Sequence, residues 1–196
     1  MKWLTEIELL KGRNNLEAGY KISNLIDVNL LVGDQGVGKS TLLDMLGNND
    51  KDLQVVLSDE AKKNGVKTYF FDSEKDNPRT KDLQMYTNIN GTPRGIGLGR
   101  AASYRWRSHG ECLIDFTIRG IEKAENCIII FDEPESGLSI RNQFKLAEAF
   151  EQAIKRNCQV FVATHCFPLI EAQEIVYSME HNEWMSSKDF IKTQEI

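Results

Sequence analysis

Eight consecutive residues of this chain have the types and the spacing that bind phosphate. They are Gly33-Asp34-Gln35-Gly36-Val37-Gly38-Lys39-Ser40, which match the P-loop pattern GxxxxGK[ST] with one additional glycine. In such a loop the backbone N–H groups and the following helix N-terminus face the phosphates, so we expect Lys39 to neutralise β/γ oxygens and Ser40 to bind magnesium. Thr41 completes the predicted phosphate-binding set. The alternative is a glycine-rich turn that merely precedes a helix.

A second candidate site follows the apolar run at residues 127–131. This run leads directly into Asp132-Glu133-Pro134, 93 residues after Lys39, and has the form of a Walker B strand. We expect that strand to lie beside the P-loop strand, with Asp132 holding Mg²⁺ through water and Glu133 polarising the attacking water. The alternative is a turn that caps the next element.

A histidine follows a third apolar run. Residues 160–163 are apolar and end in Thr164-His165. A lone histidine after a strand is more often structural than catalytic. Its place at the carboxyl end of a strand, where open parallel sheets bind their ligands, favours a functional role.

The elements that must position these residues alternate along the chain, which predicts an α/β fold with a mainly parallel sheet covered on both faces. Residues 72–107 contain prolines and glycines without a clean period and are predicted to be irregular. The predicted strands are residues 25–32, 54–57, 66–71, 127–131 and 159–163; the predicted helices begin at Lys39 and span 110–123 and 139–156, with one or two helical turns within 58–65.

Composition sets the frame for these motifs. A chain of 196 residues, 41% hydrophobic and 27% charged, is typical of one soluble domain. Its first residues are too charged for a signal peptide and no apolar run is long enough to span a bilayer, so we expect a cytoplasmic protein. The four cysteines (Cys112, Cys127, Cys158, Cys166) are interpreted as reduced, mostly buried thiols. A net charge of −5 gives no overall attraction to nucleic acid.

Taken together, these segments resemble the ATP-binding-cassette (ABC) ATPases, and specifically the SMC/RecF-like group with its small stand-alone members. The sequence FDEPESGLS at 131–139 is similar to that group's Walker B and D-loop, and ATHCFPLI at 163–170 is similar to its switch-histidine segment. Ser108-His109-Gly110-Glu111 resembles its abbreviated signature motif, SxGE, although it also fits an ordinary helix N-cap.

The resemblance implies a P-loop NTPase fold, with ATP and Mg²⁺ as ligands and a short helical subdomain at about 72–125 inserted into a single domain spanning 1–196. It implies a head-to-tail homodimer in which Ser108 and Gly110 contact the nucleotide held by the opposite subunit. Glu133 would be the general base and His165 the γ-phosphate sensor. Residues 136–139 would form the D-loop at the dimer interface. An unidentified protein effector would couple to hydrolysis.

Three features depart from the family. Asp72-Ser73-Glu74 stands where the Q-loop should be, without a glutamine. Only 68 residues separate Lys39 from Ser108, too few for the long coiled-coil arms of SMC proteins. The residue that stacks on adenine is also open between Tyr20 and Arg13.

An acid-free, arginine-rich stretch precedes Glu111. Arg94, Arg100, Arg105 and Arg107 alternate there with aromatic residues, a combination that can bind nucleic acid. A solvated loop, or one that contacts ATP or a protein, is the alternative. For the whole chain, two rivals to an ATPase stay open: a non-hydrolytic ATP switch and the cassette subunit of a transporter.

Overall fold

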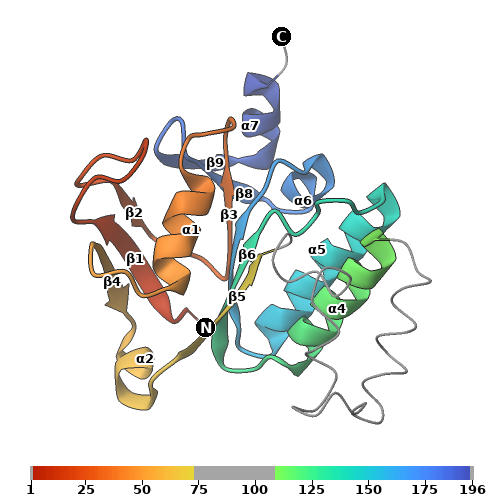
Figure 1. The fold of residues 1–196 in the computed structure, drawn as a ribbon, viewed down its shortest axis with the longest axis horizontal. Coiled ribbons are helices and arrows are strands. Elements are labelled where there is room, and N and C mark those ends of the chain that lie inside the picture. The colour runs from red at the N-terminus through yellow and green to blue at the C-terminus, as the bar shows by residue number, and fades with distance from the viewer. Residues whose placement is uncertain (1, 73–108, 195–196) are drawn as a thin grey trace, which may run out of the picture.

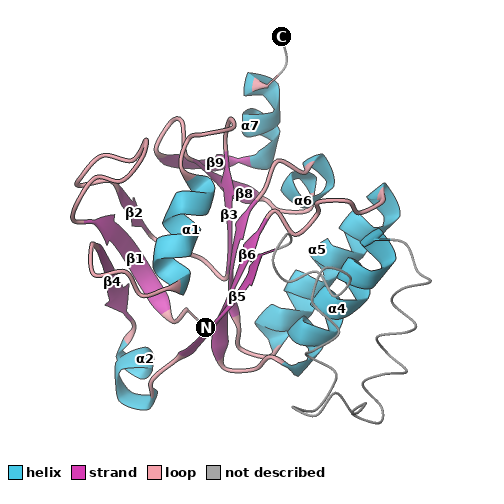
Figure 2. Ribbon diagram, viewed as in Figure 1, coloured by secondary structure: helices cyan, strands magenta, loops and turns pink. Residues whose placement is uncertain are grey.

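The computed structural model describes residues 2–72 and 109–194. Two sheets organise them: a six-stranded, mostly parallel sheet and a three-stranded antiparallel sheet (Figure 1). Figure 2 shows the larger sheet between α1 on one side and α4 and α5 on the other. The predicted α/β fold with a mainly parallel sheet is confirmed.

The larger sheet has the strand order β5-β6-β7-β3-β8-β9. All neighbouring pairs from β5 to β8 are parallel, and only β9 runs antiparallel, at the edge beside β8. The strands are β3 (Val28–Val32), β5 (Lys67–Asp72), β6 (Cys127–Asp132), β7 (Gln159–Ala163), β8 (Ile175–Ser178) and β9 (Glu183–Ser186).

This strand order corrects one prediction. We expected the strand ending in Asp132 to lie beside the P-loop strand β3, but β7 lies between them. The neighbours of β3 are therefore β8 and the strand that leads into Thr164 and His165. Asp132 still reaches the P-loop helix, because α1 packs across both β6 and β7.

Both faces of the larger sheet are buried, as alternating side chains in its central strands show. Leu30, Phe131 and Val162 belong to a core on the face covered by α4 (His109–Lys123), α5 (Ile140–Lys155) and α6 (Phe167–Glu171). Leu31 and Phe161 belong to a second core with α1 (Lys39–Gly47). Strands buried on both faces read as continuous apolar runs, which explains why the sequence revealed them.

The three-stranded sheet contributes side chains to the same second core as α1. It was not predicted from the sequence as a separate sheet. It has the order β2-β1-β4, with β1 (Leu4–Leu9), β2 (Lys21–Ser23) and β4 (Leu53–Leu57). The buried amide of Gln159, at the start of β7, accepts hydrogen bonds from the backbone N–H groups of Trp3 and Leu4 at 2.9 and 2.7 Å. This side chain joins the two sheets.

Smaller elements match or refine the sequence analysis. The polar segment after β4 forms α2 (Asp59–Asn64), capped by the Ser58 hydroxyl, and the last helix among the described residues is α7 (Ser187–Thr193). The strand predicted at 25–32 begins only at Val28. The Asn29 side chain bonds both the N–H and the C=O of Ile26, which turns the preceding segment away from strand geometry.

The predicted helical subdomain at 72–125 lies largely outside the described residues. Its described part is the end of β5 and residues 109–125, where α4 packs against α5 and contributes Ile114 and Ile121 to the core. The subdomain itself stays a prediction.

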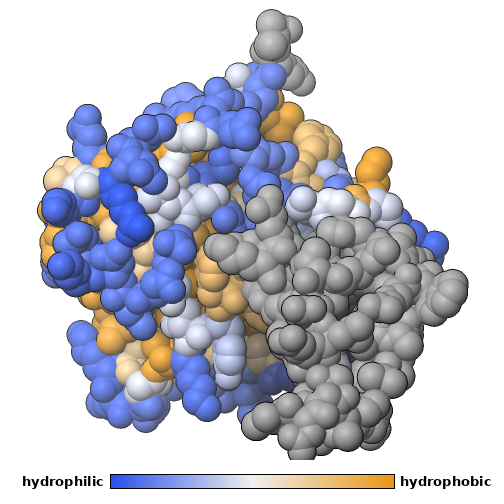
Figure 3. Space-filling model, in the orientation of Figure 1, coloured by the Kyte–Doolittle hydropathy of each residue, from blue (hydrophilic) through white to orange (hydrophobic). Residues whose placement is uncertain are grey.

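Seven large hydrophobic side chains are exposed on the described surface. Figure 3 shows a largely hydrophilic face on which hydrophobic residues also gather at the left edge and toward the middle of the view. Cys127, Cys158 and Cys166 are free and buried, as predicted, whereas the Cys112 side chain lies outside the described residues. Within 2–72 and 109–194, none of the helices combines the length and hydropathy that a membrane span requires. The large exposed hydrophobic residues are Leu10, Val56, Tyr69, Ile140, Phe144, Phe167 and Ile175, of which Ile140 and Phe144 lie one turn apart on α5.

Candidate nucleotide-binding site

The predicted P-loop connects β3 to α1 and depends on glycine for its shape. Gly38 is the N-cap of α1 with a φ of 103°, and an added Cβ would lie 2.6 Å from Cγ of Leu16. Gly36 also has a positive φ, of 87°. Only glycine adopts these conformations at little cost, and only glycine lets Leu16 approach so closely. The loop thus wraps the N-terminus of α1, whose first N–H groups are available for an anion.

Lys39 lies folded back over this loop. Its side chain is buried, and Nζ donates hydrogen bonds to the backbone carbonyls of Gly33 and Asp34, both at 2.9 Å. Burial lowers the pKa of Lys39, while nearby carboxylates, that of Glu133 first, act in the opposite direction. The Lys39 ammonium is held by neutral carbonyls inside the loop, so it can exchange these acceptors for phosphate oxygens.

Ser40 and Asp132 bring the two main motifs together. The Ser40 hydroxyl donates a hydrogen bond of 2.8 Å to Oδ1 of Asp132, although the two residues are 92 positions apart. Hydroxyl and carboxylate oxygens are hard ligands of the kind that Mg²⁺ prefers. The pair at the end of β6 and the start of α1 therefore fits the magnesium site that the sequence predicted.

Glu133 follows Asp132 in an unusual backbone conformation. Its φ is 44°, which is rare for a residue with a side chain, and its N–H donates to the carbonyl of Ala163 at 3.0 Å. The side chain is exposed and close enough to Lys39 and His165 to shift the pKa of both. Strained residues of this kind cluster at functional sites, because the surrounding structure must hold them in place.

His165 comes to the same edge of the sheet from the end of β7. Partial burial and the Lys39 ammonium lower the pKa of its imidazole, opposed by the carboxylates of Glu133 and Asp34. With Gly33 it also lines a cavity of about 200 Å³ that extends toward α6 and α7. The structure thus gathers Lys39, Ser40, Asp132, Glu133 and His165 at one edge.

Several neighbours of the P-loop were missed by the sequence analysis. Oε1 of Glu180, in the turn between β8 and β9, accepts a 2.7 Å hydrogen bond from the Asp34 N–H. The loop between β1 and β2 contributes Asn15, whose Nδ2 donates to the Gly36 carbonyl at 2.5 Å. Neither residue stands in a recognisable motif, so no signal in the sequence could have indicated it.

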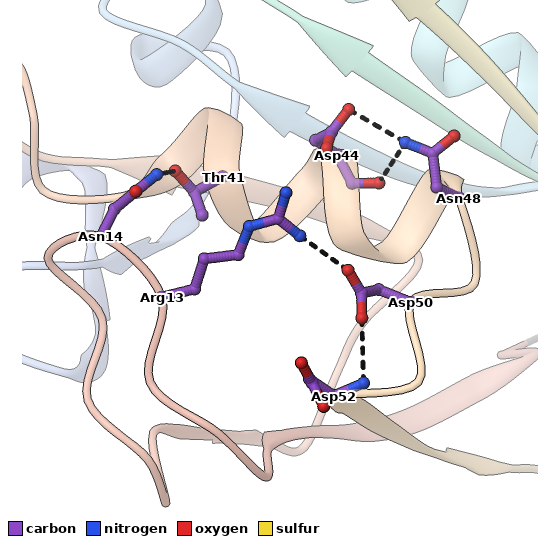
Figure 4. Close-up of polar contacts among 7 residues, drawn as sticks. All are labelled: Arg13, Asn14, Thr41, Asp44, Asn48, Asp50 and Asp52. Carbon is purple, nitrogen blue, oxygen red and sulfur yellow. Dashed lines mark hydrogen bonds and ion pairs between the residues drawn. The ribbon is translucent and has the colours of Figure 1, made fainter.

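The same β1–β2 loop runs alongside α1, as Figure 4 shows. Asn14 Nδ2 donates to the Thr41 hydroxyl at 3.0 Å, and Arg13 forms an ion pair of 2.6 Å with Asp50. Tyr20, the other adenine-stacking candidate, is partly buried with its hydroxyl donating to Met179 Sδ. Both candidates are engaged within the chain, and the assignment of the adenine contact stays open.

The remaining predicted residues fall into two groups. Gln35 is exposed on the P-loop, Val37 packs at the edge of the α1 core, and Gly110 lies in the first turn of α4. Asp72 ends β5 directly opposite Asp132 in the strand register. Outside the described residues lie Ser73, Glu74, Ser108, Arg94, Arg100, Arg105 and Arg107.

Comparisons with known proteins give a clear result only at the level of structure. No protein-family model matches the sequence, and no curated protein matches it significantly. Many solved structures do match, and they include ABC transporters and parts of ABC transporters.

One is a metal-chelate type ABC transporter in an inward-facing conformation, with a TM-score of 0.63, 18% identity and coverage of 96% of this chain and 85% of that one. Another is a nucleotide-free ATP-binding cassette from an ABC transporter, with a TM-score of 0.57, 16% identity and coverage of 98% and 94%. A third is CbiO1 from Clostridium perfringens, part of the ABC transporter complex CbiONQ, with a TM-score of 0.55, 14% identity and coverage of 99% and 93%. The chain therefore has the fold of the ATP-binding cassettes of ABC transporters.

Proposed function

We propose that this chain is an ABC-type ATPase that binds and hydrolyses ATP, and that it belongs with the SMC/RecF-like group. The observation that carries the proposal is the Ser40–Asp132 hydrogen bond of 2.8 Å, which joins the P-loop helix to the end of β6. A phosphate-binding loop alone supports nucleotide binding. A carboxylate fixed beside its hydroxyl adds a place for the metal that hydrolysis requires.

Each residue at this edge of the sheet then has a distinct part. The first N–H groups of α1 bind phosphate oxygens, and Lys39 exchanges the Gly33 and Asp34 carbonyls for them. Ser40 and Asp132 would hold Mg²⁺, which neutralises charge on the phosphates. Glu133 accepts a proton from the attacking water, and His165 senses the γ-phosphate from the end of β7.

The first experiment separates binding from hydrolysis. Glu133→Gln should keep the affinity for ATP and lose roughly 10²–10⁴-fold in kcat, because a positioned general base contributes about that much. Glu151→Gln, on the exposed side of α5, is the matched control and should behave as the wild type. Wild-type turnover by Glu133→Gln would remove Glu133 as the base.

We further propose that two copies share each ATP, head to tail. The support is the resemblance of Ser108-His109-Gly110-Glu111 to a signature motif, together with the helix α4 that begins there. A helix N-terminus with glycine and serine is a suitable anion site. In this proposal a single domain spans 1–196, with the segment 72–125 as its helical subdomain.

A mixture of two inactive variants tests the shared site. Lys39→Ala and Ser108→Arg homodimers should both lack an intact site. In a mixed dimer both substitutions fall in one site, and the other site is intact. Random pairing makes about half of the dimers mixed, so about a quarter of all sites should recover. Single-turnover hydrolysis no greater than that of the separate variants, with mixed dimers confirmed by mass, would exclude sharing.

A second candidate function is the cassette subunit of a transporter. The specific support is that the chain covers 85–94% of three matched chains from structures of ABC transporters or their parts. Affinity purification of the Glu133→Gln form with ATP distinguishes the alternatives. A co-purified membrane protein would favour the transporter, whereas DNA or a soluble effector would favour the SMC/RecF-like group.

Nucleic-acid binding through the arginine-rich stretch stays a prediction. If Arg105 and Arg107 contact backbone phosphates, replacing both with alanine should weaken binding. It should also reduce the slope of log K against the logarithm of the salt concentration by about two. No binding of DNA or RNA at low salt with ATP present would exclude this role.

A further inference from the structure

The turns that follow β6 and β7 are joined by the carboxyl group of Glu135, which is largely buried. Oε1 of Glu135 accepts a hydrogen bond of 2.5 Å from the Thr164 hydroxyl and another of 3.1 Å from the His165 N–H. The Thr164 hydroxyl in turn accepts the N–H of Cys166 at 2.9 Å. The peptide groups on both sides of the His165 Cα are thus held by side chains.

This arrangement continues where the strand ends. The backbone hydrogen bond from Glu133 N–H to the Ala163 carbonyl joins the two turns at the last residue of β7. The N–H of Thr164 still donates to Leu31 of β3, at 3.2 Å. For His165 and Cys166 the acceptors are instead the Glu135 carboxyl and the Thr164 hydroxyl. At His165, where the chain leaves the sheet, the Glu135 carboxyl therefore replaces the backbone carbonyl of a neighbouring strand as the acceptor.

Burying the Glu135 carboxyl group costs more free energy than a purely structural connection requires. Its Oε2 is buried and has no hydrogen-bond partner among the described residues. Burial raises the pKa of this carboxyl group, and the nearby Glu133 carboxylate raises it further, against the bonds from Thr164 and His165. A buried, half-satisfied carboxyl group destabilises a fold, so an apolar side chain would pack here at lower cost.

We propose that Glu135 is a positioning residue that acts through His165, fixing the imidazole beside Lys39 and Glu133. The inference rests on the proposed ATPase function and adds a residue to it. Glu135 sits two residues after Glu133 in the same tight turn, where the Ser136 N–H donates to the Glu133 carbonyl. One carboxyl group therefore ties the turn of the general base to the backbone of the histidine.

A double-mutant cycle on hydrolysis tests this directly. Glu135→Ala should lower kcat about tenfold with little change in KM for ATP, since the P-loop contacts are untouched. Glu135→Gln should stay within about threefold of the wild type, because its amide oxygen accepts the same two hydrogen bonds. In a His165→Ala background, Glu135→Ala should have no further effect. Glu151→Ala, on the exposed face of α5, controls for the loss of a surface glutamate.

Two results would overturn the inference while leaving the ATPase in place. One is a Glu135→Ala protein with wild-type kcat. The other is a double variant whose loss is the product of the two single losses, since Glu135 would then act independently of His165. If Glu135→Ala does not fold, Thr164→Val carries the same cycle, with Thr164→Ser as the variant that restores the hydroxyl donor.

Amide hydrogen exchange gives a readout that does not depend on hydrolysis. Glu135→Ala should accelerate exchange at His165, whose N–H loses its acceptor, more than at Val160 within β7. Unchanged exchange at His165 would overturn the positioning role. A wild-type protein that never hydrolyses ATP would instead overturn the proposed function, and the exchange rates would still decide whether Glu135 holds His165.

Discussion

The P-loop and the turn after β6 lie at the same edge of the sheet, yet they are held in shape by different means. The P-loop adopts positive φ at glycines, and its own lysine bonds to its carbonyls. The turn after β6 has a positive φ at Glu133, which carries a side chain. The Glu133 N–H donates to Ala163 and the Glu135 carboxyl accepts from the His165 N–H, and these bonds hold the turn to the end of β7.

The difference separates two tasks. A loop shaped by its own glycines, with Asn15 and Glu180 bonded to its backbone, is formed before a ligand arrives and suits binding. A turn whose conformation depends on a neighbouring strand end can respond to what that neighbour contacts. We therefore expect substitutions in the P-loop to change the affinity for ATP, and substitutions in the turn after β6 to change turnover.

The largest effect is expected for Gly38→Ala. The new Cβ would lie 2.6 Å from Leu16 Cγ at a φ of 103°, so we expect about 2–5 kcal/mol of destabilisation from backbone and overpacking together. Gly19→Ala, at a φ of 84° with no atom within 4 Å of its Cβ, should lose only the backbone part, about 1–2 kcal/mol. Chemical denaturation measures the stability lost in both variants. Adding Leu16→Ala should recover part of the stability lost in Gly38→Ala, but none of that lost in the other glycine variant. Equal losses at the two glycines would mean that Leu16 does not constrain the loop.

Lys39→Ala tests the binding half of the comparison. Losing a charged hydrogen-bond donor to phosphate costs about 1.5–3 kcal/mol, so the Kd for ATP should rise about 10–100-fold. Calorimetric titration measures it, with Lys145→Ala on the exposed side of α5 as the control. An unchanged Kd would place the phosphates away from this loop.

Glu133→Gly tests whether the turn after β6 is strained. Glycine accepts a φ of 44° freely, so Glu133→Gly should be more stable than Glu133→Ala by about 1 kcal/mol while both lose hydrolysis. The comparison with alanine isolates the backbone, because both variants lack the carboxylate. Equal midpoints in urea would show that Glu133 carries no backbone strain.

The smallest effect concerns pH. Because the pKa of His165 is lowered in the folded chain, the unfolded chain binds a proton more readily once the pH falls below about 6.5. Stability should therefore decline as the pH falls from about 7.5 to 5.5, and decline less in His165→Gln. Melting temperatures of both proteins at the two pH values check this. A steeper decline in the variant would contradict the sign.

Much of the fold could be predicted from the sequence, for a physical reason. The central strands are buried on both faces and appear as apolar runs, and the P-loop appears because its glycines and Lys39 are required by its backbone and charge. The strand order was not predictable from these runs, and β6 was wrongly expected beside β3, where β7 lies. Which strands pair is decided by packing between distant segments.

The supporting residues of the site were harder to foresee than its main residues. Glu180 and Asn15 reach the P-loop from turns 146 and 21 positions away, and no local pattern marks them. Glu135 stood in a recognised segment, but its bonds to Thr164 and His165 required the structure. Residues that act through backbone contacts across turns leave no spacing signal.

The central claim is that Ser40 and Asp132 together make a magnesium-dependent site for ATP hydrolysis, and phosphate release tests it most directly. The wild type should release phosphate from ATP only with Mg²⁺ present. Asp132→Asn should bind ATP and lose most of that release, and excess Mg²⁺ should restore only part of it. Equal release by the wild type and Asp132→Asn, or equal release by the wild type with and without Mg²⁺, would contradict the account.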